Sequence, residues 1–250
     1  MKIIVCVKAV PGYLVDQKTD SLVLNPYDLY TVQKITDKKK QFGWEVTCLC
    51  MGPLGAQDAL RRCYAMGADR VILLSDPHFA GSDTYATAFI LSQALRKLDF
   101  DVLICGHEAV DGETRQVPCG IASNLGYIYI SNVIDLTEKK EGELLIQCQE
   151  ENELRTLRAA TPIVLSFLDY STSSNISLMA LKRSREQEIL IWNREMLGLS
   201  EEDCGQRGSK TRVLRSKNAV EDHNKETEII EGTATDKCNF ILRMLEEYLG

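Results

Sequence analysis

Short apolar runs alternate with longer amphipathic segments through the first half of the chain. The runs at 3–7, 45–50, 70–74 and 102–105 predict strands covered on both faces, as in a parallel sheet. The segments between them repeat apolar residues at helical spacing, which predicts helices between Asn25 and Gly43 and at 56–66, 82–98 and 117–125. This alternation requires crossover connections, so we expect an α/β fold with an open, mostly parallel sheet and helices on both faces.

The pattern changes after Gly126. Apolar runs at 127–133, 144–149 and 154–159 are separated only by short polar segments, which predicts an antiparallel extension of the sheet. The run at 162–167 is expected to return to the main sheet.

The last part of the chain has a different composition again. From Asn193 to about Glu228 it is charged and poor in large apolar residues, which is typical of an extended arm. A final helix is expected at 236–249, because apolar residues recur there at helical spacing. We therefore predict an α/β domain over residues 1–192, followed by an arm and helix over 193–250 that dock on the main domain or on a partner.

Composition narrows the class of protein. The chain has 250 residues and a net charge of −7, which gives no general attraction to nucleic acid or to an anionic membrane. No apolar run approaches the roughly 18 residues of a membrane span, and the run at 3–7 is too short for a secretion signal. The nine cysteines lack the paired spacing of a zinc or disulfide framework and are interpreted as buried, reduced thiols. We expect a cytoplasmic protein.

The sequence offers little catalytic chemistry of its own. The three histidines, at 78, 107 and 223, have no metal-like spacing to cysteine or to one another. Nucleophile-elbow, Walker and dinucleotide-fingerprint motifs are missing from the sequence. These features favour a binding or carrier protein over an enzyme.

The segment from Asp111 to Val117 is the best candidate for a ligand site. It follows the expected strand at 102–105 and opens the expected helix at 117–125. A loop that connects a strand to a helix N-terminus in an open α/β sheet is a common phosphate site. Gly106 and Gly112 would allow the backbone to approach a ligand, although a tight loop without a ligand has the same pattern.

Several motifs together resemble the small (beta) subunit of electron transfer flavoproteins. The resemblance is good from residue 1 to about 170 and thin beyond it. No single motif is specific, but their common order is hard to obtain by chance. The matching segments are Val5-Cys6-Val7-Lys8-Ala9-Val10-Pro11, Asn25-Pro26-Tyr27-Asp28, Met51-Gly52-Pro53, Ala65-Met66-Gly67-Ala68-Asp69-Arg70, Asp111-Gly112-Glu113-Thr114-Arg115-Gln116-Val117 and Pro162-Ile163-Val164.

The resemblance implies an electron-carrier subunit with an adenine-nucleotide alpha-hydrolase-like fold. It implies a heterodimer with a larger alpha subunit that carries FAD, and electron exchange with an acyl-CoA dehydrogenase-like or other flavin dehydrogenase. The beta subunit itself would hold AMP or, in electron-bifurcating members, a second FAD. The loop at 111–117 looks more like the version that holds FAD, and we predict FAD here. The implied nucleotide-binding residues are Cys6, Lys8, Asn25, Asp28, Met51, Gly52, Asp111, Gly112, Glu113, Thr114, Gln116 and Val117.

The chain departs from the family pattern at several positions. His107 and Glu108 stand where the family usually has a lysine or arginine followed by glutamine, so a fixed cation is replaced by a titratable group. Ser173–Ser177 replaces a Pro-Arg-Tyr signature. The next segment still resembles the family's loop for recognising a partner dehydrogenase, although a plain helix end has the same composition. Its candidate contact residues are Leu178, Met179, Leu181 and Lys182.

Two other functions use the same fold. An enzyme of the adenine-nucleotide alpha-hydrolase type would activate a carboxylate with ATP, but it needs a Ser-Gly-Gly-like phosphate loop after the first strand. The segment from Lys8 to Gly12 does not have that composition. A nucleotide sensor without redox chemistry remains the second alternative.

Overall fold

The computed structural model describes residues 1–15, 19–140, 142–214 and 230–249, with side chains described as far as residue 246. The chain forms two compact units, Met1–Arg212 and Val213–Gly250. The part of the expected arm at 215–229 lies outside the described residues.

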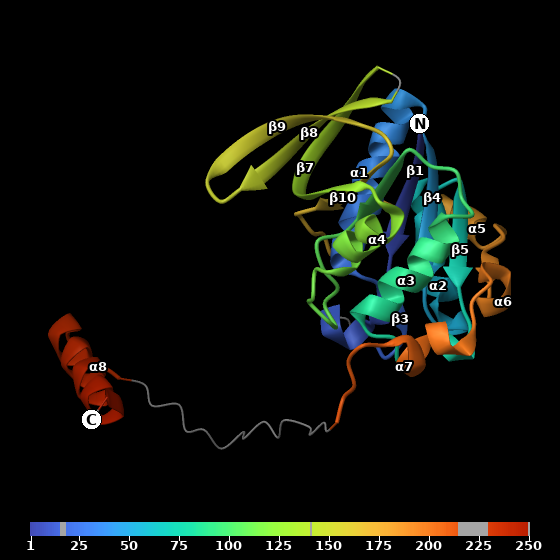
Figure 1. Ribbon diagram of the computed structural model, residues 1–250. Coiled ribbons are helices and arrows are strands. Elements are labelled where there is room, and N and C mark those ends of the chain that lie inside the picture. Colours follow the sequence, from blue (N-terminus) through green and yellow to red (C-terminus); the bar gives the residue numbers. More distant parts are fainter. Residues whose placement is uncertain (16–18, 141, 215–229, 250) are drawn as a thin grey trace. The chain divides into compact units, whose positions relative to one another are not determined.

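A nine-stranded sheet runs through the first unit (Figure 1). All pairs from β11 to β7 are parallel, and the pairs β7–β8 and β8–β9 are antiparallel. The α/β fold with an antiparallel extension is therefore confirmed. In sheet order the strands are β11 (Leu190–Trp192), β5 (Arg70–Leu74), β4 (Glu45–Met51), β1 (Lys2–Val7), β6 (Val102–Cys105), β10 (Ile163–Phe167), β7 (Ile128–Lys140), β8 (Glu143–Glu150) and β9 (Glu153–Ala160).

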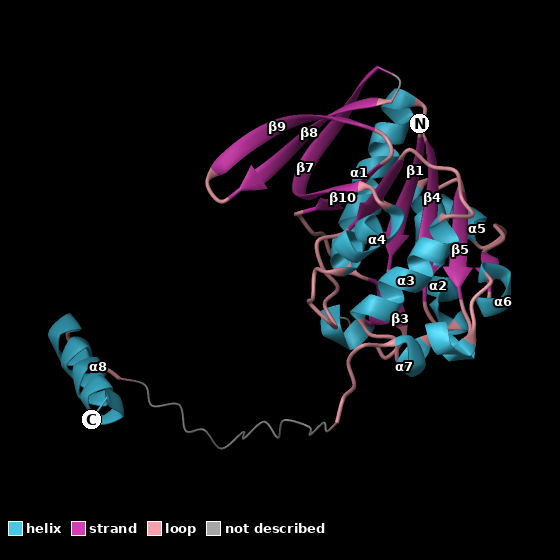
Figure 2. Cartoon of the chain, in the orientation of Figure 1, coloured by secondary structure: helices cyan, strands magenta, loops and turns pink. Residues whose placement is uncertain are grey.

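Helices cover both faces of the parallel part of the sheet (Figure 2). On one face α1 (Pro26–Phe42) and α2 (Gln57–Met66) pack on the strands, and α5 (Leu178–Ser184) packs on α2. On the other face lie α3 (Thr84–Leu95) and α4 (Val117–Leu125), and α3 is contacted by α6 (Arg194–Leu197) and α7 (Gly205–Gly208). The described part of this unit also contains four 3-10 turns: η1 (Gly12–Val15), η2 (Leu54–Ala56), η3 (Pro77–Phe79) and η4 (Glu201–Asp203).

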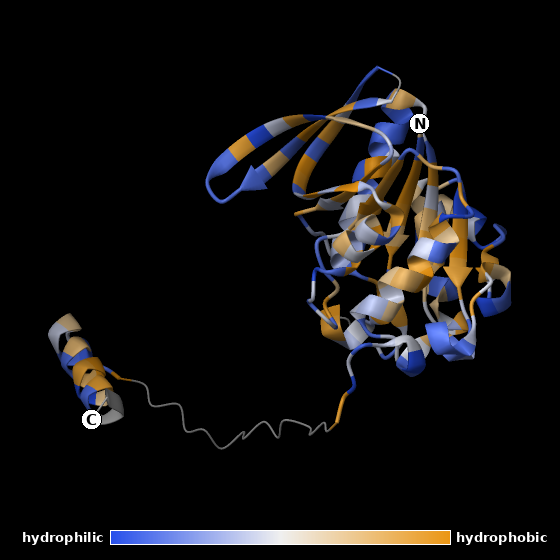
Figure 3. Cartoon of the chain, viewed as in Figure 1, coloured by the Kyte–Doolittle hydropathy of each residue, from blue (hydrophilic) through white to orange (hydrophobic). Residues whose placement is uncertain are grey.

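Strand β1 shows how the two layers are built. Ile3, Val5 and Val7 belong to the hydrophobic core under α1 and α2, whereas Ile4 and Cys6 belong to the core under α3 and α4. Successive side chains of a strand point to opposite faces, so an uninterrupted apolar run serves both layers. The central strands are accordingly apolar along their length (Figure 3).

The order of the strands reverses at β1. The chain runs from β1 through β4 to β5 on one side, and then crosses to β6 on the other side of β1. Helix α1 leaves the end of β1 toward one face, and α3 leads into β6 along the other face. Because the neighbouring connections diverge, a crevice opens at the carboxyl ends of β1 and β6, where open α/β sheets bind ligands.

Three short strands were not predicted, and one long strand extends further than expected. After β1 the chain forms a small antiparallel pair, β2 (Ala9–Pro11) with β3 (Leu22–Leu24), and β11 adds an edge to the main sheet. Strand β7 extends to Lys140, beyond the expected end at residue 133. The first part of β7 pairs with β10, and its second part pairs with β8. The polar second part is therefore held in the sheet by a different neighbouring strand.

The first unit also continues past the boundary expected at residue 192. Residues 193–212 form α6, η4 and α7, and Leu197, Leu199 and Cys204 are buried against the layer of α3. A few apolar side chains thus suffice to anchor a mainly polar segment, so the arm does not begin at residue 193.

In the second unit, α8 (Ala234–Leu249) confirms the expected C-terminal helix. Its apolar residues Ile241, Leu242, Met244 and Leu245 are exposed. Docking of this helix on a partner stays a prediction. Within the described residues, no helix has both the length and the apolar character that a membrane crossing requires.

Candidate functional site

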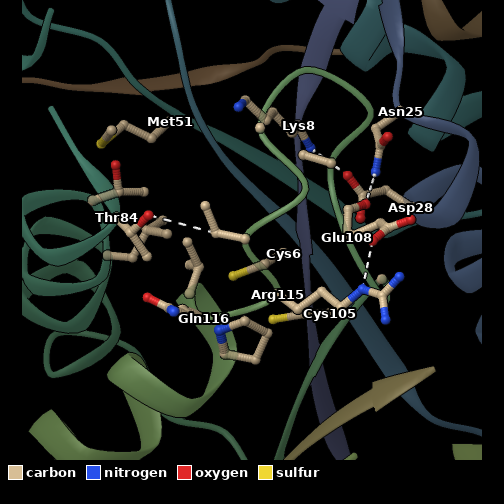
Figure 4. A pocket seen from close by; sticks show the side chains of 18 of the residues that line it. Cys6, Lys8, Asn25, Asp28, Met51, Thr84, Cys105, Glu108, Arg115 and Gln116 are labelled. Atoms are coloured by element: carbon tan, nitrogen blue, oxygen red, sulfur yellow. Dashed lines mark hydrogen bonds and ion pairs between the residues drawn. The ribbon is translucent and has the colours of Figure 1, made fainter. Parts of the chain in front are cut away.

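A cavity of about 490 Å³ lies at the crevice formed by the carboxyl ends of β1, β4 and β6 (Figure 4). Its walls come from these strand ends, from the N-terminal parts of α1 and α3, and from the loop that joins β6 to α4. Its size is in the range of pockets that hold small molecules and cofactors, about 300–1,000 Å³.

Most of the residues expected at a nucleotide site do line this cavity. Gly52 and Asp111 are the exceptions, although the Asp111 carboxylate accepts a hydrogen bond from Lys8 Nζ at 2.8 Å. Four segments that are distant in the sequence therefore meet at one place. The lining residues among those expected are Cys6, Lys8, Asn25, Asp28, Met51, Gly112, Glu113, Thr114, Gln116 and Val117.

Asp28, in the first turn of α1, contacts the ends of both β1 and β6. Its buried carboxylate accepts hydrogen bonds from the backbone N–H of Lys8, at 2.8 Å, and from that of Gly106. Burial raises the pKa of Asp28 to about 7, although the bonds from Lys8, Asn25 and Gly106 oppose the rise. The carboxyl group thus fixes the ends of β1 and β6 to the first turn of α1.

Asn25 stands at the N-cap position of α1 but makes no capping bond with its side chain. Instead its Nδ2 donates to the Glu108 carbonyl at 2.7 Å, and its Oδ1 accepts from the N–H of Val110 at 3.2 Å. The expected start of the helix at Asn25 is therefore confirmed, while its side chain is left free for other contacts. The amide is used to hold the loop after β6 against the start of α1.

The loop from Glu108 to Gln116 is tightly constrained. The Ala109 carbonyl accepts from the N–H groups of Gly112, at 3.1 Å, and Glu113, at 2.8 Å. Glu113 and Arg115 have φ values of 51° and 57°, in the left-handed region that costs a non-glycine residue about 1 kcal/mol or more. The hydrogen bonds within the loop hold its backbone in this conformation.

An ionic network supports the same loop from outside the sheet. Glu108 Oε2 accepts from Arg115 Nε at 2.5 Å, and Oε1 accepts from the Tyr27 hydroxyl at 2.8 Å. The hydrogen bond from Arg115 lowers the pKa of Glu108, so this carboxylate is ionised near neutral pH. Burial, followed by the bond to Glu108, raises the pKa of Tyr27 to about 12, so the phenol keeps its proton.

His107 also lines the cavity. Burial lowers the pKa of its imidazole, and the positive charge of Arg115 lowers it further. Its Nδ1 is buried and has no hydrogen-bond partner among the described residues. A buried, unpaired ring nitrogen at a cavity wall is a group that a ligand could satisfy.

One wall of the cavity was missed by the sequence analysis. It comprises the segment after β5, including Phe79, Asp83 and Thr84. Asp83 is the N-cap of α3 and accepts from Ala86 N at 2.9 Å, and Thr84 Oγ1 lies 3.5 Å from Thr114 Oγ1 of the loop. A polar residue that opens a helix after a strand is a recognisable signal in the sequence, and at Asp83 it could have identified this wall.

The candidate partner-recognition residues lie elsewhere, on α5. Leu178 is 85% exposed and Met179 62% exposed, whereas Leu181 is partly buried. The C-terminal end of this helix is held by Arg61 of α2, which donates to the carbonyls of Ser184, Arg185 and Gln187 at 3.1–3.2 Å. The exposed apolar side chains are thus displayed on a fixed support, while their role in recognition stays a prediction.

Comparisons with known proteins agree with the family resemblance found in the sequence. The electron transfer flavoprotein domain matches residues 14–193. Protein FixA of Sinorhizobium fredii is 35% identical over 86% of this chain and 82% of its own length. Subunit CarD of the caffeyl-CoA reductase–Etf complex of Acetobacterium woodii is 34% identical over 86% and 87%, respectively. The electron transfer flavoprotein subunit beta of Clostridium acetobutylicum is 28% identical over 99% and 98%.

The close packing at Asp28 predicts a strict size limit at Gly106. A Cβ there would lie 2.5 Å from Asp28 Oδ1 and 2.9 Å from the Tyr27 carbonyl carbon. Gly106→Ala should therefore destabilise the protein by about 1–3 kcal/mol, or roughly 2–12 °C in thermal unfolding. Gly112→Ala is the matched control, because a Cβ at Gly112 meets no atom within 4 Å. Equal melting temperatures for the two variants would contradict this packing.

The buried carboxyl of Asp28 predicts a pH dependence of stability. The folded protein keeps this proton up to about pH 7, whereas the unfolded chain loses it near the ordinary value of 3.8. The contribution of Asp28 is therefore complete below pH 4 and is lost as the pH rises to about 7. Urea unfolding should show the wild-type free energy of unfolding falling by roughly 2–4 kcal/mol relative to Asp28→Asn across this window. Parallel pH profiles for the two proteins would show that Asp28 does not titrate in this way.

Proposed function

Since this chain belongs to the electron transfer flavoprotein family, as a subunit of the beta type, we propose that its cavity binds an adenine nucleotide. The observation that carries the proposal is the convergence of four segments on one cavity: the ends of β1 and β4, the start of α1 and the loop before α4. The same segments carry the motifs by which the sequence resembles the family.

The residues of the cavity suit such a ligand. Backbone N–H groups at the start of α4, together with Thr114 and Gln116, offer donors for phosphate oxygens. Leu49, Met51 and Phe79 offer an apolar wall for a flat ring. The unpaired Nδ1 of His107 is a further polar contact.

We propose FAD rather than AMP as the nucleotide. The loop at 111–117 resembles the FAD-holding version, and its side chains between Asp111 and Gln116 leave donors for a pyrophosphate. FAD supplies the redox chemistry when bound, and this chain's residues would hold and orient it. The alternative, AMP, would make the chain part of a simple electron shuttle, with the flavin in the alpha subunit.

We propose two partners. The permanent partner is a larger alpha-type subunit that carries FAD. The redox partner is a flavin dehydrogenase of the acyl-CoA dehydrogenase type or a related one. Exposed apolar residues on two elements support the need for partners: Leu178 and Met179 on α5, and the apolar side chains of α8. Lys182, at the end of α5, adds a positive charge beside the first pair. Exposed apolar groups next to basic groups are typical of protein-binding surfaces.

An ATP-dependent enzyme of the same fold is less well supported. After β1, residues 9–11 form strand β2 and pair with β3, and Gly12 donates from its backbone N–H to the Ser21 carbonyl at 3.0 Å. The backbone at this position is thus engaged in a hairpin, where such an enzyme would need a phosphate-binding loop.

The nucleotide content of the heterodimer tests the proposal. The chain would be co-expressed with its alpha-type subunit, and the nucleotides released by acid would be separated by chromatography. We expect two FAD molecules per heterodimer. One FAD with one AMP would reject FAD at this site, and a single FAD without AMP would reject the nucleotide site itself.

Gly112→Val provides the site-specific control for that measurement. Its side chain would extend from the loop without meeting any protein atom near Cβ, so folding should be retained. The nucleotide bound by this subunit should be lost, because the branched side chain would stand beside the donors of Thr114 and Gln116. Stoichiometric nucleotide in this variant would place the ligand away from the loop.

Removal of residues 213–250 tests the proposed role of the second unit. The first unit is compact up to Arg212, so the shortened chain should keep its melting temperature. Assembly with the alpha-type subunit should weaken, because the exposed apolar face of α8 is lost. Size-exclusion chromatography over a dilution series measures the effect. An unchanged elution profile at all concentrations would count against this role.

A further inference from the structure

The charges of the cavity are unusual for a site that binds phosphate. Among the described residues that line it, only Lys8 and Arg115 carry a fixed positive charge. Lys8 Nζ already pairs with the carboxylate of Asp111 at 2.8 Å. His107 adds little positive charge, since burial and the neighbouring Arg115 both lower its pKa. Arg115 is therefore the group to consider.

Arg115 uses only one edge of its guanidinium in the contacts that the structure describes. Nε donates to Glu108 Oε2 at 2.5 Å, and no hydrogen bond to either terminal nitrogen is found among the described residues. The Arg115 side chain is 58% exposed, so these two nitrogens are accessible. Figure 4 shows the guanidinium extended beside Glu108 at the cavity.

Glu108 is well suited to hold this guanidinium in place. Its side chain is only 11% exposed, and its second oxygen accepts from the Tyr27 hydroxyl at 2.8 Å. The Glu108 carbonyl is also bound by Asn25 Nδ2 at 2.7 Å, so its backbone and its side chain are both fixed to the start of α1. An arginine that is held at Nε loses less rotamer freedom when its other edge binds a ligand.

We propose that Arg115 binds a phosphate group of the nucleotide through its two terminal guanidinium nitrogens, while Glu108 holds Nε. This inference rests on the proposed nucleotide site and adds the residue that selects for phosphate. The planar fork of arginine matches two phosphate oxygens at once, which a lysine at the same position would not. Arg115 was not among the residues expected at the site, because its role depends on the contact with Glu108.

Ligand titration of the nucleotide-free, full-length chain tests the proposal. Adenosine, AMP and ADP would be titrated by calorimetry into the wild type and into Arg115→Gln. We expect the substitution to weaken ADP binding about tenfold to a hundredfold, the usual effect of losing hydrogen bonds to a charged group. Adenosine, which has no phosphate, should bind both proteins within about twofold. Arg115→Lys should recover only part of the lost affinity.

Arg158→Gln is the matched control for net charge. Arg158 lies on β9, its Nε pairs with Glu143 at 2.9 Å, and it is not a cavity residue. ADP affinity should be unchanged in this variant. If it falls as much as in Arg115→Gln, the effect is one of overall charge, and the proposal is wrong.

The remaining outcomes separate this proposal from the nucleotide site on which it rests. Equal losses of adenosine and ADP in Arg115→Gln would mean that Arg115 only supports the fold of the loop, which overturns the proposal and leaves the site intact. Unchanged ADP affinity would overturn it as well. A wild-type protein that binds none of the three ligands would reject both the site and the role of Arg115.

Discussion

The hydrogen bonds of Asp28 hold together the part of the molecule on which the cavity depends. The carboxyl group sits at the first turn of α1 and accepts from the backbone of Lys8 at the end of β1 and of Gly106 at the end of β6. These two strands flank the point where the strand order reverses, so their ends would otherwise be free to separate. Burying a charged carboxylate is costly, which is why burial raises the pKa of Asp28. In this structure the carboxyl group joins three chain segments: α1, which carries it, and the ends of β1 and β6, whose backbone donates hydrogen bonds to it.

The sequence predicted the bounds of elements best where burial on both faces of the sheet restricts the residues to apolar ones. The bounds expected for β5, β6 and α4 agree with the structure, because an apolar run ends sharply where the chain leaves the core. Gly126 ends α4 in the left-handed conformation, as a glycine after an apolar stripe predicts. The loop at 111–117 was located for the same reason. The strand before it and the helix after it both have clear limits, so few residues remain for the connection between them.

Tertiary contacts over long sequence distances explain what the sequence did not reveal. Residues 193–212 are mostly polar, yet Asp83 accepts hydrogen bonds from the N–H groups of Lys210 and Thr211, both at 2.8 Å. No local pattern contains that information, because the partners lie more than a hundred residues apart. The hairpin of β2 and β3 is similar, since strands of three residues have too few positions for a periodicity.

The first unit carries two surfaces of different character, the cavity and the exposed side of α5. At the cavity, polar groups are bound to one another: Asn25 to the loop, Glu108 to Tyr27, and Lys8 to Asp111. On α5, in contrast, Leu178 and Met179 remain in solvent although the helix itself is fixed by Arg61. Exposed side chains on a fixed helix lose little entropy in the backbone when they bind. Arg115 is similar: its guanidinium is exposed, but the largely buried carboxylate of Glu108 orients it, so in both places the fold fixes the position of an exposed group.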